Sequence, residues 1–164
     1  MSDPLESPEL PGNELSFFLQ TRYLCVIEWL HRPFLYCLLH AQPSPARALN
    51  LPPLVPLAQR NIDISCALIR LVAVHHRHGG IWGLTRRSFV CSLLLIAAAR
   101  YNVRDRDLGT QVALSSEQRI HLPSDWHKFV RMSINTIQRW ETCGAKDLQW
   151  MGRILQGLVE MIDL

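Results

Sequence analysis

Three histidines, His75, His76 and His78, lie within four consecutive positions of the 164-residue sequence. Imidazole nitrogens bind zinc and related metals. A helical metal site, however, needs two ligands four residues apart on one face, with an acid between them as in H-E-x-x-H. Here the spacings are one and two residues, and no carboxylate lies nearby. We therefore predict no metal site and no cofactor, and we interpret the histidines as the basic end of a helix, where positive charge favours the helix dipole.

The cysteines do not form a recognisable reactive site. No C-x-x-C pair occurs, so a zinc site of the common spacing is not predicted. Cys37 and His40 are close in sequence, but Cys37 lies in an apolar run, where burial raises the pKa of a thiol and makes it inert. We interpret the thiols as free, in a reducing compartment. The cysteines are Cys25, Cys37, Cys66, Cys91 and Cys143.

No other catalytic pattern is present. The sequence lacks the G-x-S-x-G nucleophile turn and the G-x-x-x-x-G-K phosphate loop. Glu28, Glu141 and Glu160 are isolated acids in helical patterns, and we interpret them as surface ion-pair partners. We therefore predict no catalytic residues, and that the protein is not an enzyme.

The aromatic and basic residues do not predict a nucleic-acid surface. The net charge is only +3, and the arginines are scattered along the chain, whereas DNA-binding surfaces concentrate their positive charge. The tryptophans stand at predicted helix starts or on apolar stripes, which favours helix packing over base stacking. They are Trp29, Trp82, Trp126, Trp140 and Trp150.

Apolar residues recur at helical spacing along most of the chain. We therefore predict an all-α fold of about five to six helices, arranged as a bundle or as stacked hairpins. The first helix spans 14–40, with Asn13 as its cap and a kink near Arg32 caused by Pro33. A second helix spans 57–76 and ends at Gly79-Gly80. The first helix is predicted from apolar residues at helical spacing: Leu15, Phe18, Leu19, Val26, Ile27 and Leu30.

The second half of the chain predicts three more helices. The helix over 82–101 is apolar on all sides between Phe89 and Ala99, apart from one serine, and is expected to be the central buried helix. A polar surface loop is expected over 101–122. Helices over 124–142 and 146–162 should form an antiparallel hairpin, because their connection is short. The seam of the last helix consists of Leu148, Met151, Leu155, Leu158 and Ile162.

The domain organisation expected from the sequence is simple. Residues 1–13 form a flexible tail, and residues 14–164 form a single helical domain with a proline-rich linker over 42–56. The longest apolar stretch, Phe89 to Ala99, is shorter than the roughly twenty residues that span a bilayer. The N-terminus lacks the features of a secretory signal. We expect an intracellular, soluble protein without a membrane partner.

Three ordered segments resemble the C-terminal part of the fungal-specific regulatory domain, or middle homology region, of binuclear zinc-cluster transcription factors. The first is Arg22-Tyr23 followed by Arg32-Pro33. The second is the turn His78-Gly79 to Trp82, followed by Arg86 and an apolar helix. The third is Pro123 to Trp126, followed by Trp140-Glu141 and the last helix. The matches extend from about Leu15 to Ile162, which is nearly the whole chain.

This resemblance implies an all-helical regulatory domain in the nucleus that serves a metabolic or secondary-metabolite gene cluster, with a small effector in some members. The zinc-cluster DNA-binding domain of the family has no counterpart in this sequence. Direct nucleic-acid binding is therefore not expected, and the chain is interpreted as a truncated paralogue, a separately encoded helper or an incomplete gene product.

Two hypotheses of function follow. The first is a transcription-regulation module that acts through a protein partner or self-association and exposes apolar surface. The alternative is a small-ligand-binding or enzymatic helical protein of a biosynthetic cluster, with a pocket near Trp82, Arg86 and Trp126. A deep pocket with two or more convergent ionisable groups would favour the alternative.

Overall fold

The computed structural model describes residues 12–40, 52–74, 80–107, 119–141 and 146–161. These residues form five α-helices and one 3₁₀ turn, with no strand among them, so the prediction of an all-α fold is confirmed. The elements are α1 (Glu14–His40), η1 (Pro52–Leu54), α3 (Val55–Ala73), α4 (Ile81–Asp107), α5 (Trp126–Glu141) and α6 (Lys146–Glu160).

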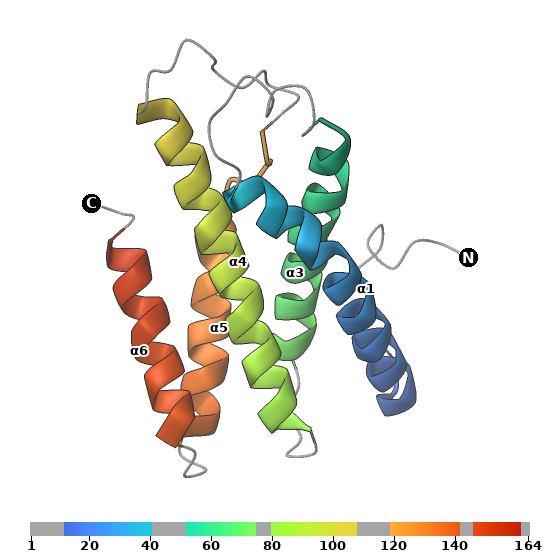
Figure 1. Cartoon of the computed structure of the whole chain (residues 1–164). Helices are drawn as coiled ribbons and strands as arrows, with labels where there is room; N and C mark the ends of the chain where they lie inside the picture. Colours follow the sequence, from blue (N-terminus) through green and yellow to red (C-terminus); the bar gives the residue numbers. More distant parts are fainter. Residues whose placement is uncertain (1–11, 41–51, 75–79, 108–118, 142–145, 162–164) are drawn as a thin grey trace.

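Helix α1 has the predicted bounds. Its first turn is capped by Asn13, whose side-chain oxygen accepts a hydrogen bond from the Ser16 amide at 2.9 Å. Pro33 lies inside the helix without ending it. Because proline has no N–H to donate to the carbonyl four residues earlier, the helix is weakened there. The last turns of α1 accordingly run at an angle to the earlier ones (Figure 1).

The last residues of the predicted linker over 42–56 belong to regular structure, while residues 42–51 lie outside the described residues. Pro52 to Leu54 form the turn η1, and Pro56 lies in the first turn of α3, where a missing N–H costs no hydrogen bond. Helix α3 ends at Ala73, with Val74 as its C-cap. Gly80, with a φ of 75°, instead precedes α4, and its carbonyl accepts hydrogen bonds from the amides of Gly83 and Leu84.

Helix α4 is longer than predicted and extends through Asp107, so the expected loop over 101–122 was wrong in its first part. Residues 119–122, the described residues of the expected loop that follow α4, are held by hydrogen bonds to α3 and α4. The Gln59 side chain donates to the His121 carbonyl and accepts from the His121 amide, at 2.9 and 2.8 Å. Asn102 donates to the Ile120 carbonyl at 2.9 Å. These bonds hold the chain in place before α5 begins.

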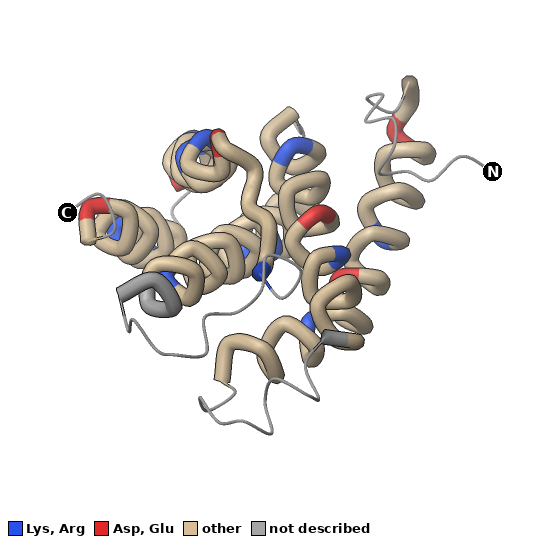
Figure 2. Tube along the Cα trace, turned by 90° about the horizontal axis from the view of Figure 1, so that it is seen from above, with Lys and Arg blue, Asp and Glu red and all other residues tan. Residues whose placement is uncertain are grey.

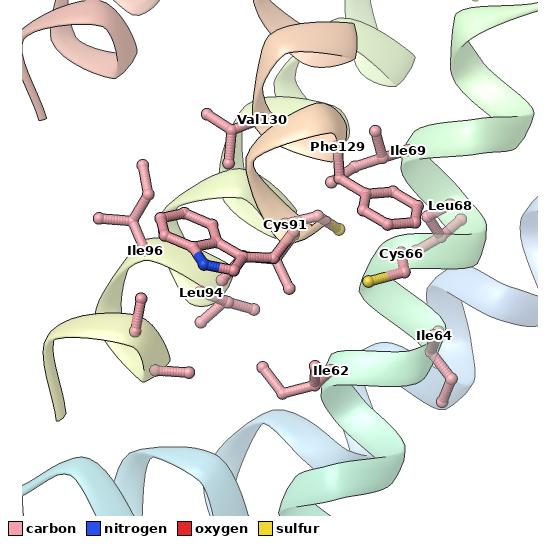
Figure 3. Packing of buried hydrophobic residues seen from close by; sticks show 14 of the residues in the cluster. Ile62, Ile64, Cys66, Leu68, Ile69, Cys91, Leu94, Ile96, Phe129 and Val130 are labelled. Carbon is pink, nitrogen blue, oxygen red and sulfur yellow. The ribbon is translucent and has the colours of Figure 1, made fainter. Parts of the chain in front are cut away.

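The centre of the molecule is shared by two helices. Helix α4 contacts α1, α3, α5 and α6, while α3 contacts α1, α4 and α5. Figure 3 shows side chains of α3, α4 and α5 converging, among them Leu68, Ile69, Cys91, Leu94 and Phe129. The prediction of a buried helix over 82–101 is therefore confirmed, but α3 is just as central.

The last two helices form the predicted hairpin. Helices α5 and α6 lie side by side and run in opposite directions (Figure 1). The predicted stripe of α5 is buried in full, and Leu148 and Leu155 of the α6 seam are buried as well. Ile162 lies outside the described residues. The buried α5 stripe consists of Phe129, Val130, Ser133, Ile137 and Trp140.

One segment of α4, Ile81–Val103, is long and apolar enough to cross a membrane by length and composition. The shorter stretch from Phe89 to Ala99, considered in the sequence, did not predict such a segment. Only 44% of the most apolar window of Ile81–Val103 is buried. Its contacts with the four other α-helices are those expected of a core helix.

Candidate interaction surface

More than half of the large hydrophobic side chains that are exposed on the described residues lie on the outer face of α1. It contains eight large hydrophobic side chains, each between 46% and 66% exposed. Soluble monomers rarely leave so many large apolar groups together on one surface, and such patches mark interaction sites. The eight side chains that define this outer face are Leu15, Phe18, Leu19, Tyr23, Val26, Trp29, Leu30 and Tyr36.

The opposite side of α1 attaches the helix to the body of the protein. Leu24, Leu35 and Leu38 are buried and belong to the hydrophobic core, and α1 packs mainly against α3. The apolar period that predicted this helix therefore belongs largely to its outer face. Of the residues used in that prediction, only Ile27 packs against the core.

A fully buried carboxylate, that of Glu28, lies behind the outer face. Arg32, one turn later, donates two hydrogen bonds to it, at 2.8 and 2.6 Å. Arg87 of α4 donates a third at 2.9 Å. Such charge-assisted, bidentate contacts are the arrangement that makes a buried charge tolerable. The interpretation of Glu28 as a surface ion-pair partner was wrong.

Asn61 of α3 completes this cluster at the weak point of α1. Its amide donates to the Glu28 backbone carbonyl at 2.9 Å and approaches the Glu28 carboxylate at 3.4 Å. Pro33 leaves the carbonyl of the next residue, Trp29, without its helical donor, so Asn61 holds α1 directly beside the break in its hydrogen-bond ladder. Three helices thus meet at one polar group, and we call Glu28, Arg32, Asn61 and Arg87 the Glu28 cluster.

The cluster also fixes the aromatic centre of the outer face. The Arg87 guanidinium, while bonded to Glu28, lies over the Trp29 ring at 4.9 Å from its centroid. The hydrogen bond from Arg32 to Glu28 raises the pKa of the Arg32 guanidinium above its ordinary value. Trp29, Arg32, Pro33 and Tyr36 line a shallow hollow of about 260 Å³ on this face. The Glu28 cluster therefore contacts the hollow directly, through Arg32, which lines it, and through Arg87, which lies over Trp29.

The thiols differ in exposure. Cys66 and Cys91 are buried, and burial raises the pKa of Cys66 to about 12 and that of Cys91 higher still. Burial also raises the pKa of the half-buried Cys25. Cys37 is exposed, so the expectation that it is buried was wrong. Cys143 lies outside the described residues.

The tryptophan prediction holds for only part of the set. Trp126 and Trp140 are buried, but Trp29, Trp82 and Trp150 are exposed. Each of the exposed rings has an arginine guanidinium over it, a cation–π arrangement. On the described residues, Lys and Arg are distributed over several helices rather than gathered in one stripe (Figure 2).

The residues of the first sequence segment come together on α1. Arg22, Tyr23 and Pro33 are exposed on its outer side, and Arg32 belongs to the Glu28 cluster. Arg22 also lies over the Phe18 ring, 5.1 Å from its centroid. This segment is therefore part of the candidate surface.

The other two segments lie elsewhere. His78 and Gly79, like His75 and His76, are outside the described residues. Arg86 lies over Trp82, donates to its carbonyl at 2.8 Å and pairs with Asp147 of α6. Trp126 is buried, and its amide bonds to the Pro123 carbonyl at 3.0 Å. Trp140 is buried and Glu141 half-buried at the end of α5.

A metal-binding group, or the pocket that the alternative hypothesis expects, would indicate chemistry in the described residues. They contain no group of three or more His, Cys, Asp or Glu side chains that could hold a metal ion. In the region where the alternative hypothesis expected a pocket, Trp82 is exposed and Trp126 is packed in the core. Ionisable groups do converge in the Glu28 cluster, but they are bonded to one another there.

Comparison with protein-family models, with curated proteins and with solved structures finds no match to this chain. The fold and the outer face of α1 are therefore the basis on which its function is argued.

Proposed function

We propose that this protein is an interaction module of transcription regulation, similar in kind to the regulatory domain of fungal zinc-cluster factors, and that it acts through the outer face of α1. One observation carries the proposal: eight large hydrophobic side chains are exposed along one helix. Leaving them in water is unfavourable, and covering them with a partner removes that cost.

The transcriptional part of the proposal is supported by where the family-like residues lie. Arg22, Tyr23 and Pro33 are on the outer side of α1, and Arg32 bonds to Glu28 directly behind it. One of the three segments that carry the resemblance thus lies on the exposed apolar surface. We propose a nuclear protein that binds another protein and is neither an enzyme nor a direct reader of DNA.

The proposal is tested by joining the full chain to an unrelated DNA-binding domain upstream of a reporter gene in a fungal host. We expect reporter transcription to change relative to the DNA-binding domain alone. The change should be lost when Leu19→Gln and Leu30→Gln are introduced together on the outer face.

A matched control is Ile154→Gln, which removes an exposed hydrophobic residue from α6. This variant should keep the reporter effect. If the wild-type fusion behaves like the DNA-binding domain alone, or if both variants behave like wild type, the proposed function is wrong.

A further inference from the structure

The exposed residues of α1 follow the spacing of a coiled-coil seam. Beginning at Leu15, they occur in alternating steps of four and three residues as far as His40. This 3.5-residue repeat keeps one stripe of a helix turned toward a second helix. The positions are Leu15, Leu19, Arg22, Val26, Trp29, Pro33, Tyr36 and His40.

We propose that α1 pairs antiparallel with α1 of a second copy of this chain, about a two-fold axis that passes between positions 27 and 28. This inference rests on the proposed function, because it names the partner of the same face. In this arrangement Leu19 lies opposite Tyr36, Arg22 opposite Pro33, and Val26 opposite Trp29 of the second copy. It is the register that pairs the whole stripe, and it is self-complementary, as a two-fold interface requires.

The sizes of the paired residues are complementary. The large Trp29 meets the small Val26, and the long Arg22 meets the compact Pro33. Pro33 lies in the hollow of about 260 Å³, whose four lining residues have the i, i+3, i+4, i+7 spacing of a hole in a coiled coil. The hollow is thus placed to receive Arg22 of the second copy.

The chemistry of the hollow suits an arginine. Trp29 and Tyr36 supply ring faces, which attract a guanidinium group. Glu28 is shared by Arg32 and Arg87, at 2.6 and 2.9 Å, so one net positive charge remains behind the hollow and the ring contacts must outweigh its repulsion. Arg22 itself lies over the Phe18 ring, so its charged end is already placed against an aromatic surface.

The ends of the helix also favour antiparallel pairing. Glu14 lies in the first turn of α1, and His40 in the last. Antiparallel pairing brings the first turn of each helix beside the last turn of the other. Glu14 of one copy then lies near His40 of the other, and the two helix dipoles run in opposite directions, which is favourable.

The available area indicates a weak dimer. A helix of 27 residues is about 40 Å long at about 1.5 Å per residue. Because the last turns of α1 run at an angle to the earlier ones (Figure 1), two copies share less than this length, and a contact strip about 10 Å wide gives at most about 400 Å² per copy, roughly half of the standard interface area. Trp29 and Tyr36, both in the seam, are of the types that dominate binding energy. We therefore expect an equilibrium that depends on concentration and that a covalent cross-link can trap.

The test uses two versions of the full chain, one with Leu19→Cys and one with Tyr36→Cys. Both carry Cys37→Ser, which removes an exposed thiol, and Cys143→Ser. Each version is oxidised alone and in an equal mixture under mild conditions, and covalent dimers are counted by non-reducing electrophoresis. We expect at least a tenfold excess of dimer in the mixture over either version alone. A Leu19→Cys chain mixed with an Ile154→Cys chain is the matched control, and circular dichroism verifies that all versions are folded.

Two outcomes overturn the inference. Cross-linking of each version alone, as strong as in the mixture, indicates parallel pairing, because identical positions then face each other. A mixture that cross-links no more than the control indicates that the face does not bind a second copy. If the reporter still depends on Leu19 and Leu30 in that case, the proposed function survives with a different protein partner. If cross-linking succeeds while the reporter fails, only the proposed function is lost.

Discussion

At the scale of single residues, the Glu28 side chain decides how α1 is attached. A buried carboxylate is stable only when positive or hydrogen-bonding groups surround it, and three residues from three helices do so here: Arg32, Asn61 and Arg87. Arg87 also supports the Trp29 ring at the centre of the outer face. The cluster therefore links the stability of the fold to the shape of the surface.

Replacing Glu28 should destabilise the protein strongly. Glu28→Gln leaves two partly buried arginines without a counter-charge, and breaking a buried ion pair costs about 3–5 kcal/mol. We expect a decrease of that order in the free energy of unfolding, measured by urea titration. Glu160→Gln, which changes an exposed acid on α6, should change it by less than about 0.5 kcal/mol. Equal effects of the two substitutions would contradict the role given to the cluster.

The raised pKa of the Cys66 thiol predicts that the protein loses stability in alkaline solution. This pKa is raised from 9.0 to about 12 in the folded protein, so the folded state binds the proton more tightly than the unfolded state. The stabilisation is complete below pH 9 and decreases as the pH rises from there toward 12. Between pH 8 and pH 10, the free energy of unfolding measured by urea titration should decrease less for Cys66→Ala than for wild type. An unchanged pH dependence would refute this assignment.

At the scale of elements, α1 shows what periodicity can and cannot predict. Its bounds and its Asn13 cap follow from the sequence, because capping and spacing are local properties. Its orientation does not follow, because apolar residues occur on both sides of the helix. The available signal was the spacing of Glu28 and Arg32, which are four residues apart and can form an ion pair between the two apolar sides of the helix. Assigning that pair to the interior requires Arg87 and Asn61, which only the tertiary structure brings close.

The two sides of α1 should respond differently to substitution. Leu35→Ala removes a fully buried side chain and should lower the free energy of unfolding by about 2–5 kcal/mol. Leu30→Ala shortens a side chain that is 60% exposed and should change it by less than about 0.5 kcal/mol. Urea titration of dilute samples, in which self-association is minimal, measures both. Similar losses from the two variants would mean that the outer face is buried within the monomer.

At the scale of the whole molecule, the sequence predicted the core helices of the second half well. The α5 stripe is strongly periodic, and its short connection to α6 leaves little choice of geometry. The centrality of α3 and the length of α4 were missed. Both depend on packing between distant segments, such as the bonds from Gln59 to His121. The outward position of three tryptophans was missed for the same reason.

The position of α4 in the core predicts that the full chain does not insert into bilayers, although Ile81–Val103 is apolar enough to do so. Its contacts with four other helices would be lost on insertion. We expect the chain to stay in the supernatant when neutral phosphatidylcholine vesicles are sedimented. Co-sedimentation that resists alkaline carbonate would show instead that α4 spans the membrane. Co-sedimentation that carbonate reverses and that Leu19→Gln with Leu30→Gln abolishes would identify lipid as the occupant of the outer face.

The most direct test of the central claim, that the outer face of α1 is a surface for association, is sedimentation velocity over a wide range of chain concentration. Wild type should shift from its monomer mass of 18.8 kDa toward twice that value as concentration rises. The Leu19→Gln, Leu30→Gln variant should remain a monomer, and Ile154→Gln should behave like wild type. A wild-type chain that stays monomeric throughout, or an outer-face variant that associates as wild type does, would contradict the account.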